Sequence, residues 1–524
     1  MQIYSFSPFG YEGSLVSVEV DLRRGIPSVD MVGLADGAVK ESRERMRSAI
    51  RNSGFDFPPE RVLISLSPAD LKKEGAGFDL AIALSVLASK TSVNPAGKEL
   101  LGFPILVMGE LELSGKLRPV KAVHAAASTA ASSGIMHCVV PSENAMEARE
   151  VKGMKVFAAS DLTEAYSALF DADAFSVGIS SPENGFLPEN CQCIDGVYFP
   201  EIRMECSFDR ISGQHELIRA LQICAAGGHN ILAFGPPGCG KTMAMQCFPE
   251  ILPLLTLEEA QSVTRIYSIA GLLQPTQPLV RIPPFRMPHQ TASIEGICGG
   301  GNSCRPGEIS LAHNGVLFLD EVAEFRSSVL QMLRVPLESA SITLSRAGRS
   351  TVYPASFQLL MSANPCPCGN YGSENKICLC SARSVEQYWK KFSSPLLDRV
   401  DLRVKCTSVD TMAAGDDEPV QKNGLTASLR KGIAAGIKMQ RERQGIKNAR
   451  LRPEQIHEYC IQDYESRIIL EKAVSRHDFS PRAVASCLKV ARTIADMECS
   501  SVIEGRHMEE AVKYRKNSGM DGLL

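Results

Sequence analysis

Polar and apolar residues follow two different periods along the first 170 residues of the chain. Residues 15–20 alternate with the period of two that is typical of a β-strand, and residues 61–66 are a second strand-like stretch. Between them, residues 38–52 carry apolar side chains at helical spacing. A hairpin is predicted around Ser114-Gly115, followed by an alanine-rich helix and a further strand. Residues 1–170 are therefore predicted to form an α+β domain.

The pattern changes after this domain. Residues 171–206 are rich in Ser, Pro, Asn, Gly and Asp with little periodicity, which indicates a linker. Residues 207–408 return to apolar strands that alternate with helices, and the polar stretch 409–425 indicates a second linker. Residues 426–518 have the pattern of a helical domain. We expect an α/β core, with a parallel sheet flanked by helices, followed by a helical C-terminal lid.

Length and composition narrow the class of protein. With 524 residues the chain is too long for one compact core, and 44% apolar with 22% charged residues is typical of globular proteins. The 56 Lys and Arg against 59 Asp and Glu give a net charge of −3, so contact with nucleic acid would have to come from local patches. The apolar runs fall short of the ~20 residues that span a bilayer. The first residues lack the pattern of a secretory signal, so we expect a cytoplasmic protein without membrane contact.

The most informative segment is residues 230–242, NILAFGPPGCGKT, which satisfies G-x-x-x-x-G-K-[ST] between an apolar strand and a helix. Glycines let backbone N–H groups converge on phosphate oxygens, and the helix N-terminus adds the positive end of its dipole. The lysine supplies a positive charge to the β- and γ-phosphates, and the threonine hydroxyl is a ligand for Mg²⁺. The residues expected to bind ATP and Mg²⁺ are Gly235, Pro236, Pro237, Gly238, Cys239, Gly240, Lys241 and Thr242.

Two further strands end in polar residues. Residues 316–319 are apolar and are followed by Asp320 and Glu321, and parallel sheets bind ligands at the carboxyl ends of their strands. We expect Asp320 to hold the Mg²⁺ and Glu321 to orient or deprotonate the attacking water. Residues 357–363 form a third strand that ends at Asn364, whose amide can polarise the same water.

Two arginines are candidates for contact with the transferred phosphate. Arg399 directly precedes a strand, and its rigid guanidinium can bridge two phosphate oxygens. Without further context it is equally well a surface residue or one paired with Asp398 or Asp401. Arg482 lies near the start of a helix opened by Pro481, which we expect to carry it back toward the nucleotide as part of a lid.

Seventeen cysteines in a long chain without an export signal favour reduced thiols or a metal site. Cys366, Cys368, Cys378 and Cys380 form C-x-C…C-x-C within 15 residues. Four thiolates fit a closed tetrahedral Zn²⁺ site, which would stiffen the loop after Asn364. The spacing is shorter than the common C-x₂-C forms, so loop cysteines without metal and a disulfide pair remain open.

These pieces, in this order, resemble an AAA+ ATPase: phosphate loop, acidic strand, sensor Asn364, finger Arg399 and lid sensor Arg482. The resemblance is closer still to the magnesium-chelatase-like subfamily and, within it, to the ComM/YifB family. The segments that carry this closer resemblance are residues 20–50, 65–88, 305–325, 336–369 and 394–402. The resemblance extends across nearly the whole chain. It implies a homohexameric ring in which ATP binds between subunits and Arg399 acts on the neighbour's γ-phosphate.

The resemblance also implies an N-terminal domain of the Lon-protease, ribosomal-protein-type fold. In Lon-type proteases a serine precedes a helix and a lysine activates it. Here the corresponding turn is Gly75-Ala76-Gly77, which has no hydroxyl, so we do not expect proteolysis even though Lys121 lies near the lysine position.

The family is linked to natural transformation, as helicases that drive branch migration of recombining DNA, so the resemblance implies DNA as a partner. Two stretches that project into the central pore in the subfamily are residues 281–302 and the predicted hairpin 341–353, which turns at Ala347-Gly348. There, arginines could bind DNA phosphates and an aromatic ring could stack on a base. The alternative is that these stretches are solvated turns without contact to DNA. The candidate DNA-binding residues are Phe285, Arg286, Arg346 and Arg349.

The leading hypothesis is thus an ATP-driven motor on DNA. An alternative is an ATP-dependent protein remodeller of the magnesium-chelatase type, which the N-terminal domain argues against because the chelatase ATPase subunit begins directly with its AAA+ module. An ATP-dependent peptidase is a third hypothesis, which Gly75 disfavours.

Overall fold

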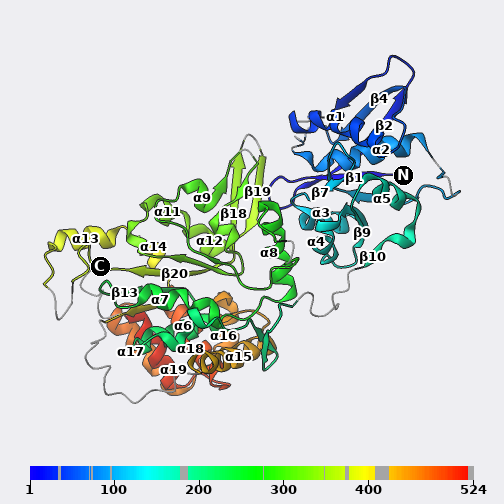
Figure 1. Cartoon of the computed structure of the whole chain (residues 1–524). Coiled ribbons are helices and arrows are strands. Elements are labelled where there is room, and N and C mark those ends of the chain that lie inside the picture. Colours follow the sequence, from blue (N-terminus) through cyan, green and yellow to red (C-terminus); the bar gives the residue numbers. More distant parts are fainter. Residues whose placement is uncertain are drawn as a thin grey trace.

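The computed structural model describes residues 1–33, 37–69, 71, 73, 75–91, 93–94, 97–177, 187–274, 277–301, 303–346, 349–371, 377–392, 394–407 and 424–516. Figure 1 shows two lobes, the N-terminal domain in blue and cyan and a larger lobe formed by the rest of the chain. Helix α8 (Leu257–Ala270) of the larger lobe lies where the two lobes meet. Among the described helices, none is both long and apolar enough to cross a membrane.

The N-terminal domain is built on a mixed eight-stranded sheet of strand order β10-β9-β8-β5-β1-β2-β4-β3. Its strands are β1 (Ile3–Ser7), β2 (Ser14–Arg23), β3 (Val29–Val32), β4 (Arg61–Ser67), β5 (Ile105–Val107), β8 (His137–Pro141), β9 (Lys155–Ala159) and β10 (Ser176–Val177). Its helices are α1 (Gly37–Asn52), α2 (Asp79–Lys90), α3 (Val123–Ser132), α4 (Ala145–Arg149) and α5 (Leu162–Ser167), and β6 (Glu110–Leu111) pairs with β7 (Leu117–Arg118) in a separate hairpin. The strands, helix and hairpin predicted for this domain are confirmed.

The core of this domain follows from the same pattern. Burial alternates along β4, so one face of the sheet is turned inward. Residues 79–87 of α2 are all buried, as expected for a helix that is apolar all round and lies inside the domain. The likeness of this domain to Lon proteases stays a prediction.

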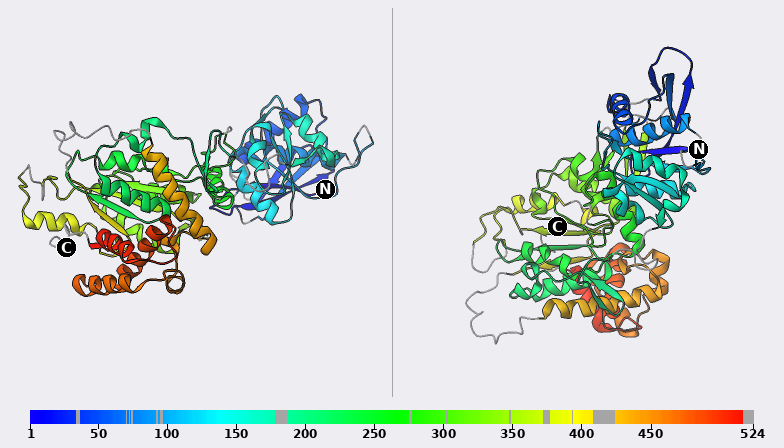
Figure 2. Two further views of the ribbon diagram at one scale, coloured as in Figure 1. Left: turned by 90° about the horizontal axis from the view of Figure 1, so that it is seen from below. Right: turned by 45° about the vertical axis from the view of Figure 1, so that its right-hand side comes forward.

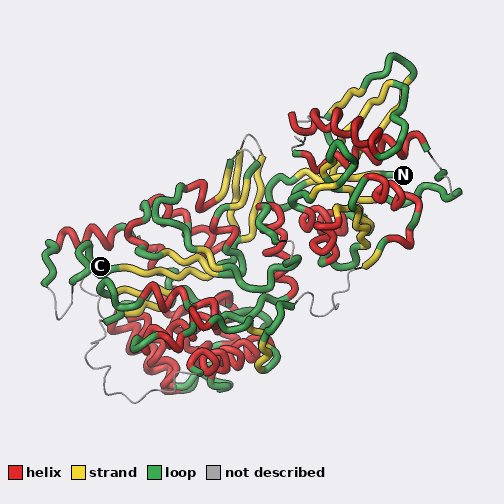
Figure 3. The backbone as a smooth tube through the Cα atoms, viewed as in Figure 1, coloured by secondary structure: helices red, strands yellow, loops and turns green. Residues whose placement is uncertain are grey.

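The larger lobe contains a central module built on a five-stranded parallel sheet of order β14-β17-β20-β13-β21. Its strands are β13 (Ile231–Phe234), β14 (Phe285–Arg286), β17 (Val316–Leu319), β20 (Gln358–Ala363) and β21 (Leu402–Lys405). Its helices are α6 (His215–Gly227), α7 (Lys241–Gln246), α8, α9 (Ile294–Cys298), α10 (Glu308–Leu311), α11 (Ser327–Met332), α12 (Arg334–Ser339), α13 (Ala382–Lys390) and α14 (Ser394–Leu397). Strands β13, β17 and β20 are buried along their whole length, because helices cover both faces of a parallel sheet (Figure 3).

Three short strand pairs complete the larger lobe: β11 (Gln192–Ile194) with β12 (Val197–Phe199), β15 (Gly299–Gly300) with β16 (Arg305–Pro306), and β18 (Ser341–Arg346) with β19 (Arg349–Pro354). The first pair lies within the predicted linker 171–206. Val197 and Phe199 are buried in the core of the central module, and the Arg430 guanidinium lies 5.2 Å from the Phe199 ring centroid. This part of the predicted linker therefore packs as part of the larger lobe.

The described residues 424–516 contain the α-helices α15 (Leu425–Arg443), α16 (Pro453–Tyr459), α17 (Tyr464–His477), α18 (Pro481–Met497) and α19 (Gly505–Lys516). Figure 2 shows them, in orange to red, gathered on one side of the central module. Their buried apolar residues join those of α6 and β13 in one core. The second predicted linker lies almost entirely outside the described residues, which resume at residue 424.

Polar contacts fasten the N-terminal domain to α8. Arg265 donates hydrogen bonds to the carbonyls of Tyr11 and Glu12, each at 2.9 Å. The buried His124 ring lies 2.7 Å from the Gln261 side-chain oxygen, and burial lowers the pKa of His124 to about 4. The Tyr11 N–H also donates to the Thr351 hydroxyl of β19 at 3.1 Å. The N-terminal domain thus contacts both α8 and the middle of strand β19 in the β18–β19 hairpin.

Candidate active site

The loop between β13 and α7 has the backbone of a phosphate-binding turn. Gly238 and Gly240 have φ of 80° and 87°, values that residues with a Cβ atom rarely adopt. Gly240 also caps the N-terminus of α7. The buried Lys241 ammonium donates hydrogen bonds to the carbonyls of Gly235 and Pro236, each at 2.8 Å. One loop therefore holds the features predicted for residues 235–242: the glycines, the helix N-terminus and the lysine.

Thr242 and Asp320 meet at the carboxyl edge of the sheet. The Thr242 hydroxyl, in the first turn of α7, donates to the two Asp320 carboxylate oxygens at 3.0 and 3.2 Å. Asp320 follows β17 directly, so the parallel sheet brings these residues together over 78 positions of sequence. A hydroxyl and a carboxylate are oxygen ligands of the kind that Mg²⁺ prefers, so this pair fits the ion.

Two residues that the sequence analysis missed support the acidic pair. Ser362, in β20, donates from its hydroxyl to Asp320 and accepts a hydrogen bond from the Glu321 N–H at 2.9 Å. Gln290 donates to the exposed Glu321 carboxylate at 2.9 Å. A serine that follows three apolar residues in a buried strand is a signal that could have found Ser362, whereas nothing local marks Gln290. Asn364 follows β20, so it lies at the same edge of the sheet as Glu321.

Arg399 and Arg482, the two arginines predicted to contact phosphate, both contact Glu338. Arg399, only 9% exposed, lies with its Nη2 2.5 Å from the Glu338 Oε1, and its Nη1 donates to the Pro395 carbonyl. Arg482, at the start of α18, donates to the same Glu338 oxygen. The partner of Arg399 is thus neither Asp398 nor Asp401.

Arg482 and Arg399 face the same cleft. Arg399, Arg482 and Glu338 line an open cleft between the central module and the C-terminal helices, together with Arg450 and Lys489. None of residues 235–242 lines that cleft in the described part of the chain. Helix α18 therefore brings Arg482 to Arg399 and not beside residues 235–242 of the same chain, and its expected position near a nucleotide stays a prediction.

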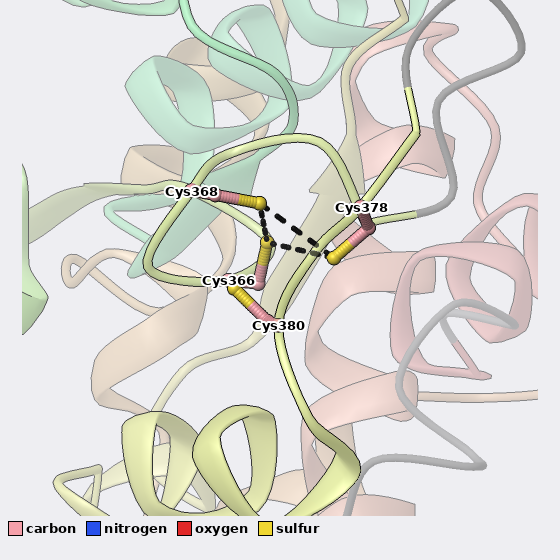
Figure 4. Close-up of side chains that lie close together, drawn as sticks. All are labelled: Cys366, Cys368, Cys378 and Cys380. Carbon is pink, nitrogen blue, oxygen red and sulfur yellow. Dashed lines mark hydrogen bonds between the residues drawn. The ribbon is translucent and has the colours of Figure 1, made fainter.

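The four cysteines of the C-x-C pairs lie together in a loop that follows Asn364 (Figure 4). Their sulfur atoms all lie within 4.8 Å of one another, with Cys366–Cys368, Cys366–Cys378 and Cys368–Cys378 separations of 3.4, 3.7 and 3.6 Å. Zn–S bonds of about 2.3 Å in a tetrahedron require sulfur atoms roughly 3.8 Å apart. The Asn370 N–H and then the Cys366 thiol lower the pKa of Cys368 to about 6, whereas desolvation and the neighbouring Cys368 raise the pKa values of Cys378 and Cys380, so without a metal one thiolate of the cluster is favoured.

The cysteine loop rests on the phosphate loop. Gly369 has φ of 77°, and a Cβ built on it would lie 2.7 Å from the Pro237 ring, so only glycine permits this approach. On the other side of the loop, the buried Trp389 ring donates to the Pro365 carbonyl at 3.0 Å. Any group that fixes the cysteine loop therefore also fixes the surroundings of the loop at residues 235–242.

The candidate DNA-binding residues fall into two groups. Strands β18 and β19 form the predicted hairpin, with Arg346 paired to Arg349 next to its tip, while Ala347-Gly348 and the side chain of Arg349 lie outside the described residues. The Arg346 side chain is half-exposed and lies 3.8 Å from a Glu295 carboxylate oxygen. The structure therefore places a basic residue near the end of a projecting hairpin.

Phe285 and Arg286 require a correction. They form β14, an edge strand paired in parallel with β17, and not a projecting insertion. The Phe285 ring lies 5.9 Å from that of Phe318, and Arg286 binds both carboxylate oxygens of Glu308 at 2.6 and 2.8 Å. Their side chains are used within the fold.

In the N-terminal domain, the turn at Gly75 opens a short helical turn before α2, with a Gly75 φ of 87°. The first residue of α2, Asp79, is fully buried and accepts hydrogen bonds from Ser42 and from Arg45, the latter at 2.8 Å. Lys121 contacts the central module, because a Cβ built on Gly271 would lie 2.6 Å from its side chain.

Comparisons with known proteins agree on one family. Three family models match: "Magnesium chelatase, subunit ChlI" over residues 207–414, "Subunit ChlI of Mg-chelatase" over 18–144, and "Magnesium chelatase, subunit ChlI C-terminal" over 424–515. The Salmonella typhimurium protein YifB is 36% identical over 536 residues, which cover 100% of this chain and 97% of that protein. Competence protein ComM of Haemophilus influenzae is 36% identical over 517 residues, which cover 98% and 97%. The magnesium-chelatase 38 kDa subunit of Cereibacter sphaeroides is 27% identical over 175 residues, 30% of this chain and 52% of that protein.

Proposed function

The chain belongs to the ComM/YifB family of magnesium-chelatase-like AAA+ proteins, and from that premise we propose that it is an ATP-hydrolysing ring motor that acts on DNA. We further propose that the ring is a hexamer and that it promotes branch migration during recombination in natural transformation. The name of the relative ComM, a competence protein, supports the link to DNA uptake. The observation that carries the motor proposal is the separation of the phosphate loop from the arginine pair Arg399 and Arg482.

One half of the site would bind the nucleotide. The N–H groups of residues 235–242 and the Lys241 ammonium would hold the phosphates. Thr242 and Asp320 would hold Mg²⁺, which when bound neutralises charge on the β- and γ-phosphates. Glu321, exposed and oriented by Gln290, would orient the attacking water or take its proton, and Asn364 would polarise that water.

The other half would come from the next subunit. Arg399 and Arg482 point to one cleft away from their own phosphate loop, which is the arrangement needed if both serve the γ-phosphate of a neighbour. A shared site predicts complementation: mixing Lys241→Ala with Arg399→Ala chains should restore part of the hydrolysis, because an intact loop can then meet an intact arginine. Full hydrolysis by isolated subunits would contradict a shared site.

The test of the DNA proposal is an ATPase assay with single-stranded, duplex and four-way DNA, run beside a measurement of oligomer mass with and without ATP. We expect ATP-dependent assembly and turnover that DNA stimulates, most strongly with single-stranded or branched substrates. If none of the DNA substrates changed the rate of ATP hydrolysis but a protein partner raised it, the alternative of a protein remodeller would be supported instead. That alternative rests on the likeness to the magnesium-chelatase subunit.

We also propose that Cys366, Cys368, Cys378 and Cys380 bind one Zn²⁺ as a structural ion, because their thiols lie at tetrahedral separations. Protein purified without added metal should contain one zinc per chain by mass spectrometry, and Cys368→Ser should lose it. Cys499→Ser is the matched control, because Cys499 is a free, exposed cysteine elsewhere in the chain. Equal zinc content in both variants would remove the site.

A further inference from the structure

A single carboxylate holds both arginines of the proposed trans half-site. The Glu338 Oε1 lies 2.5 Å from Arg399 Nη2 and also accepts a hydrogen bond from Arg482. The two arginines come from separate elements, 61 and 144 positions further along the chain, so Glu338 is the point that joins them. Its own side chain is half-exposed at 49%, at the edge of the open cleft.

A carboxylate and a phosphate use the same donors. Guanidinium groups bind planar pairs of anionic oxygens, and an N–H that donates to a carboxylate is not available to a phosphate oxygen in the same direction. The hydrogen bond from Arg399, followed by that from Arg482, lowers the pKa of Glu338, so this residue carries its negative charge at neutral pH. Glu338 therefore competes with any phosphate that approaches the two arginines.

Glu338 is also joined to the β18–β19 hairpin. It lies one residue before the end of α12, and after Ala340, which has φ of 53°, the chain continues directly into β18. The Ser339 hydroxyl donates to the Ser341 carbonyl at 3.0 Å, and the Ala355 N–H donates to the Ala340 carbonyl at 2.7 Å. Hydrogen bonds thus hold the end of α12 to the start of β18 and to the residue that follows β19. We therefore expect a displacement of the hairpin to move the end of α12.

We propose that Glu338 is a positioning residue that occupies Arg399 and Arg482 until the hairpin moves, and that it thereby links DNA binding to hydrolysis in the neighbouring subunit. This inference rests on the proposed function, because it takes the two arginines as the trans half of the site and the hairpin as the DNA contact. When DNA displaces the hairpin, Glu338 withdraws and the arginines become available to the γ-phosphate. Without DNA, the carboxylate keeps turnover low.

The experiment compares ATP turnover of the wild type, Glu338→Gln and Glu338→Ala with and without single-stranded DNA, at equal oligomer mass. The amide keeps the shape of the side chain but loses its charge. We expect DNA-free turnover to rise by up to about fivefold, the factor that corresponds to one partly exposed ion pair. Turnover with saturating DNA should stay within twofold of the wild type, so that the stimulation ratio falls. Glu386→Gln is the matched control, because the ion pair that the described residues give Glu386 is with Lys390, both half or more exposed on α13.

The outcomes separate this inference from the proposed function. If DNA stimulates the wild type and both Glu338 variants keep the low DNA-free rate, the inference is wrong and the motor proposal stands. If DNA does not stimulate the wild type, the motor proposal fails, and a raised rate in Glu338→Gln still shows that the carboxylate occupies the arginines. Equal loss of turnover with and without DNA, together with a lowered thermal midpoint, would make Glu338 a structural residue and would overturn the inference.

Discussion

The N-terminal domain and the central module each contain a strand, a glycine turn and a helix, and the two turns share a backbone feature. Gly75 and Gly240 both have φ of 87° and both stand at the N-terminal end of a helical segment. Around Gly240 stand a lysine, a threonine and, from another strand, Asp320. The turn Gly75-Ala76-Gly77 itself contains no hydroxyl or lysine, the fully buried Lys73 before it donates to the Pro68 carbonyl, and the nearby Asp79 is buried inside the domain.

The difference shows that turn geometry alone does not make an active site. Asp79 is fully buried and is satisfied by Ser42, by Arg45 and by the Leu111 N–H at 3.3 Å, so its interactions are complete within the fold. Asp320 accepts hydrogen bonds too, but it lies partly exposed at the open edge of a parallel sheet, where a ligand can reach it. The first aspartate stabilises a domain, and the second is available for chemistry.

The largest expected effect tests whether the chemistry of the central module needs a second subunit. Arg399→Ala should lower ATP turnover by ~10³-fold, the scale known for arginine fingers, while ATP affinity stays unchanged. The affinity is measured with a fluorescent nucleotide and the rate by phosphate release. Arg383→Ala, an exposed arginine of α13, is the control and should leave both unchanged. Normal turnover in the Arg399 variant would show that the proposed finger is misassigned.

The next largest effect tests whether Asp79, which follows the Gly75 turn, has a structural role in the N-terminal domain. Asp79→Ala should lower the free energy of unfolding of the N-terminal domain by roughly 4 kcal/mol, because it removes one partner of a buried ion pair. Urea denaturation followed by circular dichroism measures this change. Asp21→Ala removes an exposed pair with Arg23 and should cost well under 1 kcal/mol.

Nucleotide affinity should remain that of the wild type in Asp79→Ala. If the variant instead lost ATP binding with its stability intact, the two glycine turns would belong to one functional site, and the comparison would fail.

A smaller effect concerns the contact between the two lobes. Burial lowers the pKa of His124 to about 4 in the folded chain, against 6.5 for the ordinary side chain. Between these values the unfolded chain binds more protons, so the stability conferred by a neutral His124 falls as the pH falls through that window. From pH 7 to 5 the loss should be about 2 kcal/mol.

The matched variant for this prediction is His124→Gln, whose amide can still donate to Gln261. The wild type should lose more stability between pH 7 and 5 than the variant does, in urea titrations of both proteins. The difference isolates His124, because the neighbouring Glu147 and the buried His313 are present in both. Equal pH dependence would mean that His124 does not titrate differently on folding.

The sequence predicted the parts of the site that depend on local patterns. The phosphate loop and the acidic strand are contiguous motifs, and the parallel sheet then brings Thr242 to Asp320 without further information. Glu338 could not be predicted as the partner of Arg399, because nothing in a sequence reports which residues 61 positions apart will meet. Phe285 and Arg286 were misplaced because a two-residue edge strand flanked by prolines has the sequence of a loop.

The smallest expected effect concerns the hairpin. Arg346→Ala should weaken DNA binding severalfold and reduce by about 1 the slope of log K against log salt, because one phosphate contact and its released counterion are lost. ATP turnover without DNA should not change, since Arg346 contacts only Glu295 among its described partners. Arg349→Ala gives a second measurement on the facing strand, and the Arg346→Ala, Arg349→Ala pair should lower the slope further. Fluorescence anisotropy at several salt concentrations provides the slopes. If both variants keep the wild-type slope, the hairpin does not contact the phosphates, and the motor would have to hold DNA through another surface of the central module.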